Sequence, residues 1–332
     1  MASFTTSFDS IMTTAALPDA VEISTSTTDE ELQVSIIVNS ATAATVDLYP
    51  FGGQVVLYDI RTIIEDVMLQ NNLAFATCNV SVVDNNATTS AGSFTVIMSD
   101  IDIPNISTWL ASHFLTTRTS QRISANGQQL VNWFSAQGES VNYKIEAIVD
   151  NGTTQVVSTW TERASQTVNK GVYYSLISVE GIIAHFEDEG QVRAFKVYRG
   201  ANRTMEFYIT EEEPNMLFKF KNNFNVEEYV GLYAATNRKQ KLEASEANIL
   251  RTMVKYDFNT ITEYEVVSAM LTVEEAKWLS QMVTSREVHL KINASTWKEI
   301  LIDGESEVSD LAGDENRLKF SYQFAKRVKH LI

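Results

Sequence analysis

The sequence predicts a mainly β protein built from two to three antiparallel β-sandwich or barrel-like domains with a few short helices. Apolar and polar residues alternate in short runs along most of the chain, as in Glu31–Val38. Turn-forming sequences separate these runs at intervals of roughly a dozen residues, which is typical of sandwiches and barrels. At 332 residues the chain is also too long for one ordinary β core, so we expect more than one domain.

The first domain is predicted over residues 1–104. Residues 1–18 are small and polar, and we interpret them as an arm or a strand that needs a partner. Alternating strands follow, and then a helix over Ile60–Leu69, for which Asp59 is the expected N-cap. Two further strands flank the turn that begins at Asp84, which completes a compact β domain with one helix.

The second domain is predicted over residues 105–214 and the third over residues 215–332. The second begins with a helical stretch and continues as strands, including a hairpin around Asp150-Asn-Gly and a strand over Gly171–Ile183. In the third domain Thr272-Val-Glu-Glu275 is a capping box, which predicts a single helix among antiparallel strands. The expected result is a β-sandwich-like domain followed by a β-rich domain with one capped helix.

Charge is distributed very unevenly. The first 117 residues contain thirteen acidic residues and one basic residue, Arg61, and so carry −12 of the net charge of −16. Lysine normally protects exposed strand edges and covers solvated faces. A lysine-free, strand-patterned segment is therefore either covered by a partner or faces a surface where positive charge would be harmful. The pI of 4.7 argues against specific nucleic-acid binding, which needs clustered Lys and Arg.

Catalytic, cofactor-binding and metal-binding residues are not predicted. The chain lacks a P-loop, a Gly-x-Ser-x-Gly elbow, a His-Glu-x-x-His pair and a Gly-x-Gly-x-x-Gly loop, and its four histidines lie in separate segments. Acidic pairs such as Glu187-Asp-Glu189 suit a glycosidase, but solvated turns are a far commoner setting for them. The single cysteine, Cys78, is expected to pack as a small apolar residue. We therefore expect no enzymatic activity and no cofactor.

The termini carry two further expectations. The N-terminal segment lacks the features of a secretory signal, and no apolar run is long enough to span a bilayer, so we expect synthesis in a cytoplasm and no membrane partner. Basic residues gather near the C-terminus, at Arg238-Lys-Gln-Lys241 and at Lys326, Arg327 and Lys329. This basic tail is either solvated or docks between subunits on the acidic first domain of a neighbour.

Two groups of sequence segments resemble a known class of proteins. The first group is Phe114-Leu-Thr-Thr-Arg-Thr-Ser with Gln128-Gln-Leu-Val-Asn-Trp-Phe. The second is Asn222-Asn-Phe-Asn-Val-Glu-Glu, Glu263-Tyr-Glu-Val, Leu271-Thr-Val-Glu-Glu-Ala-Lys-Trp-Leu-Ser and Thr284-Ser-Arg-Glu-Val. Together they resemble structural proteins encoded in tail or virion gene clusters of phages and prophages of gut Bacteroidales. The resemblance covers the last two-thirds of the chain and leaves out the lysine-free first domain.

The resemblance implies a virion component, which would be made in the host cytoplasm and would assemble with copies of itself and with other virion proteins. We therefore expect a subunit of a tail, neck or baseplate that forms a homo-oligomeric ring around a DNA conduit. An acidic lining would repel the duplex and let it slide, and Glu31 and Asp47 are the candidate acidic channel face.

Two alternatives remain open. A receptor- or carbohydrate-binding module, such as a phage fibre or adhesin, requires exposed aromatic residues grouped on one face of the second domain. A glycan-cleaving enzyme requires two carboxylates about 5–10 Å apart in a cleft.

Overall fold

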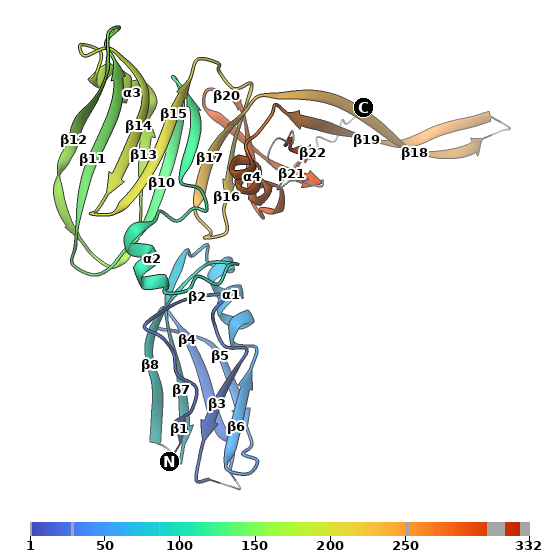
Figure 1. Cartoon of the computed structure of the whole chain (residues 1–332). Helices are drawn as coiled ribbons and strands as arrows, with labels where there is room; N and C mark the ends of the chain where they lie inside the picture. The colour runs from blue at the N-terminus through green and yellow to red at the C-terminus, as the bar shows by residue number, and fades with distance from the viewer. Residues whose placement is uncertain (1, 28–29, 86, 250–251, 304–315, 326–332) are drawn as a thin grey trace.

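A computed structural model of the chain describes residues 2–27, 30–85, 87–249, 252–303 and 316–325, and within residues 241–260 it describes only the course of the backbone. The protein is mainly β with a few short helices, as predicted (Figure 1). Most strand pairs are antiparallel, but two are parallel, β2 with β8 and β9 with β15. The bounds of these four strands are Ile11–Thr13, Ala87–Ile97, Ser120–Ser124 and Arg203–Thr210.

The N-terminal part is a sandwich of two sheets with one helix. The five-stranded sheet has the order β2, β8, β7 (Phe75–Asp84), β4 (Leu32–Val38), β5 (Ala41–Leu48). The three-stranded sheet has the order β1 (Ser3–Phe4), β3 (Ala20–Ser24), β6 (Gln54–Tyr58). Side chains from both sheets meet in one core with Ile60, Ile64 and Met68 of helix α1 (Ile60–Gln70). The alternation that predicted these strands therefore reflects one buried face on each sheet.

One expectation for this region is confirmed in one of its two forms, and another needs correction. The segment before Pro18 contains strands with partners and is not a free arm, because β1 pairs with β3 and β2 pairs with β8 inside the domain. Asp59 precedes α1 but does not cap it, since its φ of 60° is left-handed and its side chain makes no capping hydrogen bond. A capping residue normally has extended backbone, which aims its side chain at the first free N–H groups of the helix.

The middle part combines a five-stranded sheet with a two-stranded one. The five-stranded sheet has the order β12 (Gln155–Val168), β11 (Glu139–Asp150), β14 (Gln191–Arg199), β15, β9. The two-stranded sheet consists of β10 (Gln128–Ser135) and β13 (Gly171–Ser178). The expected hairpin around Asp150 is present as β11–β12. The strand expected over Gly171–Ile183 is shorter than predicted and ends at Ser178. Ser178 is the N-cap of helix α3 (Val179–His185), because its hydroxyl oxygen accepts a hydrogen bond from Gly181 N at 3.4 Å.

The C-terminal part is a seven-stranded sheet covered by helix α4 (Val273–Thr284). The strand order is β17 (Glu227–Leu232), β16 (Met216–Lys221), β20 (Val288–Asn293), β21 (Thr296–Asp303), β22 (Lys319–Phe324), β19 (Thr252–Ser268), β18 (Ala234–Ile249). The predicted capping box is present, because Thr272 and Glu275 bond each other's backbone N–H groups. Leu279 and Met282 of α4 then pack on the sheet.

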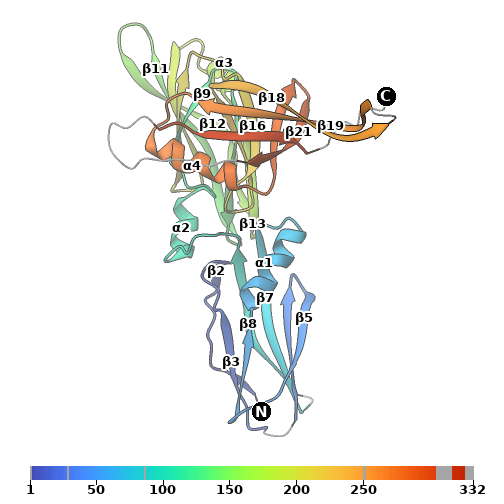
Figure 2. The same ribbon diagram turned by 90° about the vertical axis from the view of Figure 1, so that its right-hand side faces the viewer.

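A long hairpin extends from this sheet. Strands β18 and β19 pair along their whole length, but β22 pairs with β19 only over Tyr264–Val267. Beyond that point the hairpin is a two-stranded ribbon, and it projects from the body of the molecule in both views (Figures 1 and 2). The sequence predicted only its last stretch, Glu263–Ser268, as a strand.

The three parts meet at one apolar junction. Its buried members are Ile97, Ile106, Leu110, Leu115, Phe134, Phe224 and Val226. Helix α2 (Ile106–Ser112) lies at this junction, between the N-terminal sandwich and the two upper sheets (Figure 1). An amide bond also crosses it, from Asn225 Nδ2 to Leu73 O at 3.1 Å. Shared burial at this point holds the N-terminal sandwich against the rest of the chain.

Candidate functional site: assembly surfaces and the interdomain cleft

The candidate acidic residues Glu31 and Asp47 are exposed and lie on one face of the five-stranded N-terminal sheet. Residues Gln33 and Asp47 are opposite each other across β4 and β5. Tyr49 OH donates to Glu31 Oε2 at 3.0 Å, and Gln33 Nε2 donates to Asp47 Oδ1 at 3.4 Å. The Glu31 carboxylate raises the pKa of the Tyr49 hydroxyl by accepting its hydrogen bond. The structure thus brings the two predicted acids together on the solvent side of the sheet.

Much of the rest of this face carries small polar side chains, although Ile37 and Val83 also lie on it. Thr77 is opposite Thr95, Asn79 is opposite Ser93, and Ser81 is opposite Ser90 across β7 and β8. Several of these groups bond each other, as in Ser90 Oγ to Asn79 Oδ1 at 2.6 Å and Ser35 Oγ with Thr45 Oγ1 at 3.2 Å. The face is therefore rich in hydroxyl groups, and its two candidate acids lie at the β4–β5 end.

The candidate basic tail, Lys326, Arg327 and Lys329, lies outside the described residues. Of the other basic group, Arg238 and Lys239 are exposed on β18. Lys239 Nζ forms an ion pair with Glu265 across the hairpin.

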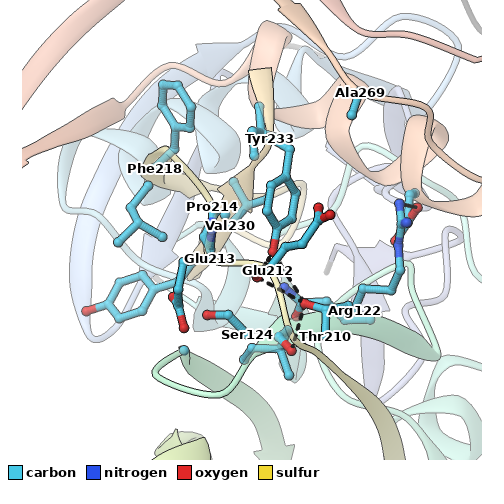
Figure 3. A pocket seen from close by; sticks show the side chains of 18 of the residues that line it. Arg122, Ser124, Thr210, Glu212, Glu213, Pro214, Phe218, Val230, Tyr233 and Ala269 are labelled. Carbon is cyan, nitrogen blue, oxygen red and sulfur yellow. Dashed lines mark hydrogen bonds and ion pairs between the residues drawn. The ribbon is translucent and has the colours of Figure 1, made fainter. Parts of the chain in front are cut away.

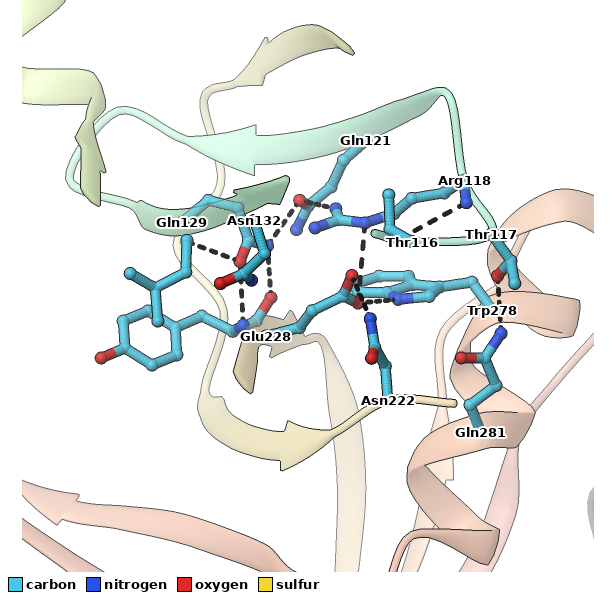
Figure 4. A network of polar contacts seen from close by, with 12 residues as sticks. Thr116, Thr117, Arg118, Gln121, Gln129, Asn132, Asn222, Glu228, Trp278 and Gln281 are labelled. Carbon is cyan, nitrogen blue, oxygen red and sulfur yellow. Dashed lines mark hydrogen bonds and ion pairs between the residues drawn. The ribbon is translucent and has the colours of Figure 1, made fainter. Parts of the chain in front are cut away.

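A buried ionic network connects the second domain to the third (Figure 4). Glu228 of β17 is 1% exposed and accepts from Asn222 Nδ2 at 3.0 Å and from the indole N–H of Trp278. The Arg118 guanidinium lies 4.1 Å above the Trp278 ring, and its Nε is 3.9 Å from Glu228 Oε2. Burial lowers the pKa of Arg118, and the Glu228 charge opposes this. Each buried charge is thus compensated by a group from the other domain.

Sequence reasoning did not single out this network, although a signal was present. Val226, Glu228, Val230 and Leu232 all point to the buried side of β17 or its approach. A carboxylate at an inward position of a strand is expensive to bury and needs a partner. Glu228 in that alternating pattern therefore indicated a buried cation from elsewhere in the chain.

Side-chain amides join the two domains next to this network. Gln129 Nε2 donates to Tyr229 O at 2.5 Å, and Tyr229 N donates to Gln129 Oε1 at 2.9 Å. Asn132 Nδ2 donates to Glu227 O at 2.8 Å. The Gln129 amide thereby takes the place of a backbone partner along β17, so this end of the seven-stranded sheet is covered by β10.

A cleft of about 420 Å³ opens on the other side of this boundary (Figure 3). Arg122 crosses it and bonds both carboxylate oxygens of Glu275, at 2.7 and 2.6 Å. Elsewhere in the cleft Asn126 Nδ2 donates to Glu213 Oε1 at 2.9 Å. Glu213 belongs to the acidic segment 211–213, part of which Figure 3 shows beside Tyr233. Glu275 also completes the capping box of α4. The Arg122–Glu275 pair therefore joins the second domain to the third, whereas the Asn126–Glu213 bond lies within the second domain.

The aromatic residues do not form the cluster that a sugar-binding face of the second domain requires. Tyr174 and Tyr208 are 71% and 47% exposed but belong to different sheets, on β13 and β15. A stacked pair does line the cleft, where Tyr229 and Trp297 have ring centroids 5.7 Å apart. Both residues come from the third domain.

The described residues offer little other chemistry. No group of three or more His, Cys, Asp or Glu side chains among them is arranged to hold a metal ion. His113 stacks on Trp109 and His185 on Trp160, so both rings pack against indoles. No helix in the described part of the chain has the length and apolar character needed to cross a membrane.

Cys78 packs in the N-terminal core as predicted, at 1% exposure. Burial raises the pKa of its thiol to about 12, so the reactive thiolate is scarce at ordinary pH. We expect the native protein to resist an aromatic disulfide reagent at pH 8 and to react rapidly in denaturing urea. Fast labelling of the folded protein, followed by absorbance, would contradict this burial.

Comparisons with known proteins do not identify a family. No protein-family model and no curated protein matches the sequence. Among solved structures the chain is similar to the extracellular region of plexin A4, domains 1 to 8, with 9% identity and a TM-score of 0.22. The alignment covers 97% of this chain and 40% of the plexin chain. At that score the similarity carries no argument about fold or function.

Proposed function

We propose that this chain is a structural subunit of a phage virion, in the tail, neck or baseplate, and that it works as a closed homo-oligomeric ring around a DNA conduit. The observation that carries the proposal is the β18–β19 hairpin. It extends well beyond the last strand that supports it, since β22 pairs with β19 only over Tyr264–Val267.

The physical reason lies in the stability of two-stranded ribbons. An isolated hairpin is marginally stable in water, because each strand has one neighbour and no layer to pack on. A two-stranded ribbon gains stability when another surface covers it. A chain that carries one is a component of an assembly, and this agrees with the resemblance to virion proteins of gut Bacteroidales phages.

The first domain supports the same function. It contains no lysine, and the face that holds Glu31 and Asp47 is rich in hydroxyl groups. Cations on a conduit wall would bind DNA phosphates and release counterions, which slows a moving duplex. A wall of hydroxyls with a few carboxylates gives the duplex little to bind. In this proposal the protein acts as a passive ring that guides DNA, and it needs no catalytic residue and no cofactor.

The virion assignment is tested by quantitative mass spectrometry of purified particles from a phage or induced prophage that carries the gene. We expect the protein in washed particles at a fixed ratio to the other structural proteins. Its presence in the lysate but absence from particles would contradict the proposal. The host cytoplasm is the expected site of synthesis, so the unassembled protein should be found there before lysis.

Charge reversal tests the conduit. Glu31→Lys with Asp47→Lys should slow DNA ejection while leaving particles intact, because each lysine adds a phosphate contact. Glu22→Lys is the matched control, since Glu22 is exposed on β3 of the opposite sheet. Ejection is followed by dye fluorescence after receptor or chaotrope triggering. Equal ejection rates for both kinds of variant would argue against this face as the lumen.

A receptor- or carbohydrate-binding role is the alternative, and the Tyr229–Trp297 pair in the cleft is the observation that favours it. Indole faces bind the C–H faces of sugars, and nearby amides such as Asn126 bond hydroxyls. Glycan-array binding that is lost in Trp297→Ala but kept in Trp109→Ala would support this role. An empty array would oppose it.

A further inference from the structure

We propose that copies of this chain join head to tail by strand pairing, with β18 of one copy adding to the open edge of β12 in the next. The inference rests on the proposed ring and deepens it, because it names the two surfaces that build the ring.

Both strands end a sheet. In the described part of the chain they are the longest strands that do so, with 14 residues in β12 and 16 in β18. Strand β12 pairs with β11 alone, and β18 pairs with β19 alone. A sheet edge presents a row of backbone N–H and C=O groups that can accept another strand.

The positions of the two edges suit a repeated contact. Strand β12 and the β18–β19 hairpin lie at opposite sides of the upper part of the molecule in Figure 1. The other end of the seven-stranded sheet is covered by β10 through the Gln129 amide. A contact between two different surfaces is heterologous, and it repeats from copy to copy until the rotation closes a ring. Pairing of β12 with a second β12 would instead stop at a dimer.

The first half of the β12 edge lacks the usual protection against pairing. The strand contains no lysine and no proline, and its charged residues, Glu162 and Arg163, both lie in its second half. The outer face of the first half carries an exposed apolar pair, Val157 at 68% exposure and Ile148 opposite it on β11 at 38%. An exposed, uncharged edge of this kind can accept another strand.

Charge also matches between the two edges. The turn Glu187-Asp-Glu189 is exposed beside β12, and Ser158 Oγ on β12 donates to Glu189. Arg238 and Lys239 are exposed on the proximal half of β18. Opposite charges at the two surfaces set the orientation of the encounter and disfavour pairing of like edges. A second copy of this chain is therefore the occupant that both edges fit.

Cross-linking of a mixture of two variants, each with one added cysteine, tests the contact. Val157→Cys and Gln240→Cys both change exposed positions, and the native Cys78 is buried. We expect a short bismaleimide to join the two variants into a mixed dimer, at least about tenfold more abundant than the dimer of either variant alone. The double variant should give a ladder of products. Absence of the mixed dimer, or an equal dimer from Val157→Cys alone, would overturn the proposal.

Edge blocking provides a second test with a matched control. Val157→Lys places a lysine on the edge, and Tyr174→Lys places one at a comparably exposed position on β13. The first should weaken assembly about tenfold or more, and the second should leave it unchanged. Light scattering on the same samples separates the two proposals. A ring without the mixed dimer leaves the proposed function standing and removes this contact, whereas a monomer without the mixed dimer removes both.

Discussion

Glu228→Ala is expected to lower the free energy of unfolding by about 3–5 kcal/mol. The side chain is buried at the boundary of the second and third domains, where it accepts from Asn222 and Trp278 and faces Arg118. Its removal leaves the Arg118 guanidinium in a dry site without a counter-charge and leaves the Trp278 indole N–H without an acceptor. The lost counter-charge and the lost hydrogen-bond acceptor both belong to the contact between the two domains, so their relative position should be weakened as well.

The neighbouring Glu227 supplies the control. Its carboxylate pairs with Lys219 Nζ at 3.2 Å, and both side chains are partly exposed, at 29% and 22%. Glu227→Ala should cost less than about 1 kcal/mol, since exposed pairs contribute little. Urea unfolding followed by tryptophan fluorescence measures both variants. Similar losses for Glu227→Ala and Glu228→Ala would show that the buried network does not stabilise the boundary.

Arg203→Ala is expected to have an effect of similar size, about 3–5 kcal/mol, in the second domain. The guanidinium is 2% exposed and donates to Leu110 O at 2.7 Å, to Phe134 O at 2.9 Å and to Glu139 Oε1 at 2.5 Å. It therefore joins α2, β10 and β11 to β15 through one planar group. Burial of Glu139 disfavours its charge, but the Arg203 and Ser135 hydrogen bonds outweigh burial and lower the pKa of Glu139.

Two further substitutions serve as controls for this prediction. Arg203→Lys keeps the charge but loses the fork that reaches three acceptors, so it should recover only part of the stability. Arg193→Ala removes a guanidinium that is 44% exposed and 3.5 Å from Asp150, and it should cost less than about 1 kcal/mol. Calorimetric melting compares the three variants. An Arg203→Ala protein as stable as Arg193→Ala would contradict the role of Arg203 at this junction.

Local patterns in the sequence predicted the features that depend on neighbouring residues. The alternation of Leu318, Phe320, Tyr322 and Phe324 predicts a strand with one buried face. The first three side chains are buried, and Phe324 packs partly buried against the same core. The capping box from Thr272 to Glu275 could be predicted because both partners lie within one helical turn. Helix α1 followed from its apolar face, although Asp59 does not cap it.

Features that depend on distant pairing were not predicted. Strand β9 joins β15 in parallel, with Ser120 opposite Glu206, and no local signal encodes that pairing. Strand β18 was missed because its sequence, Ala234–Ile249, is polar and charged and lacks a sustained alternation of apolar residues. The Arg118–Glu228 pair was missed for a related reason, since its partners are far apart in sequence. Glu31 and Asp47 lie on one face because the consecutive strands β4 and β5 pair, and their role as a channel face stays a prediction.

In the proposed function this chain assembles with copies of itself, so the purified protein should be an oligomer in solution. Light scattering of the purified full-length protein at low and moderate salt measures its mass directly. We expect one discrete species whose mass is an integer multiple, well above two, of the 37.2 kDa chain. A monomer that persists across protein concentration and salt, with an intact fold, would contradict it.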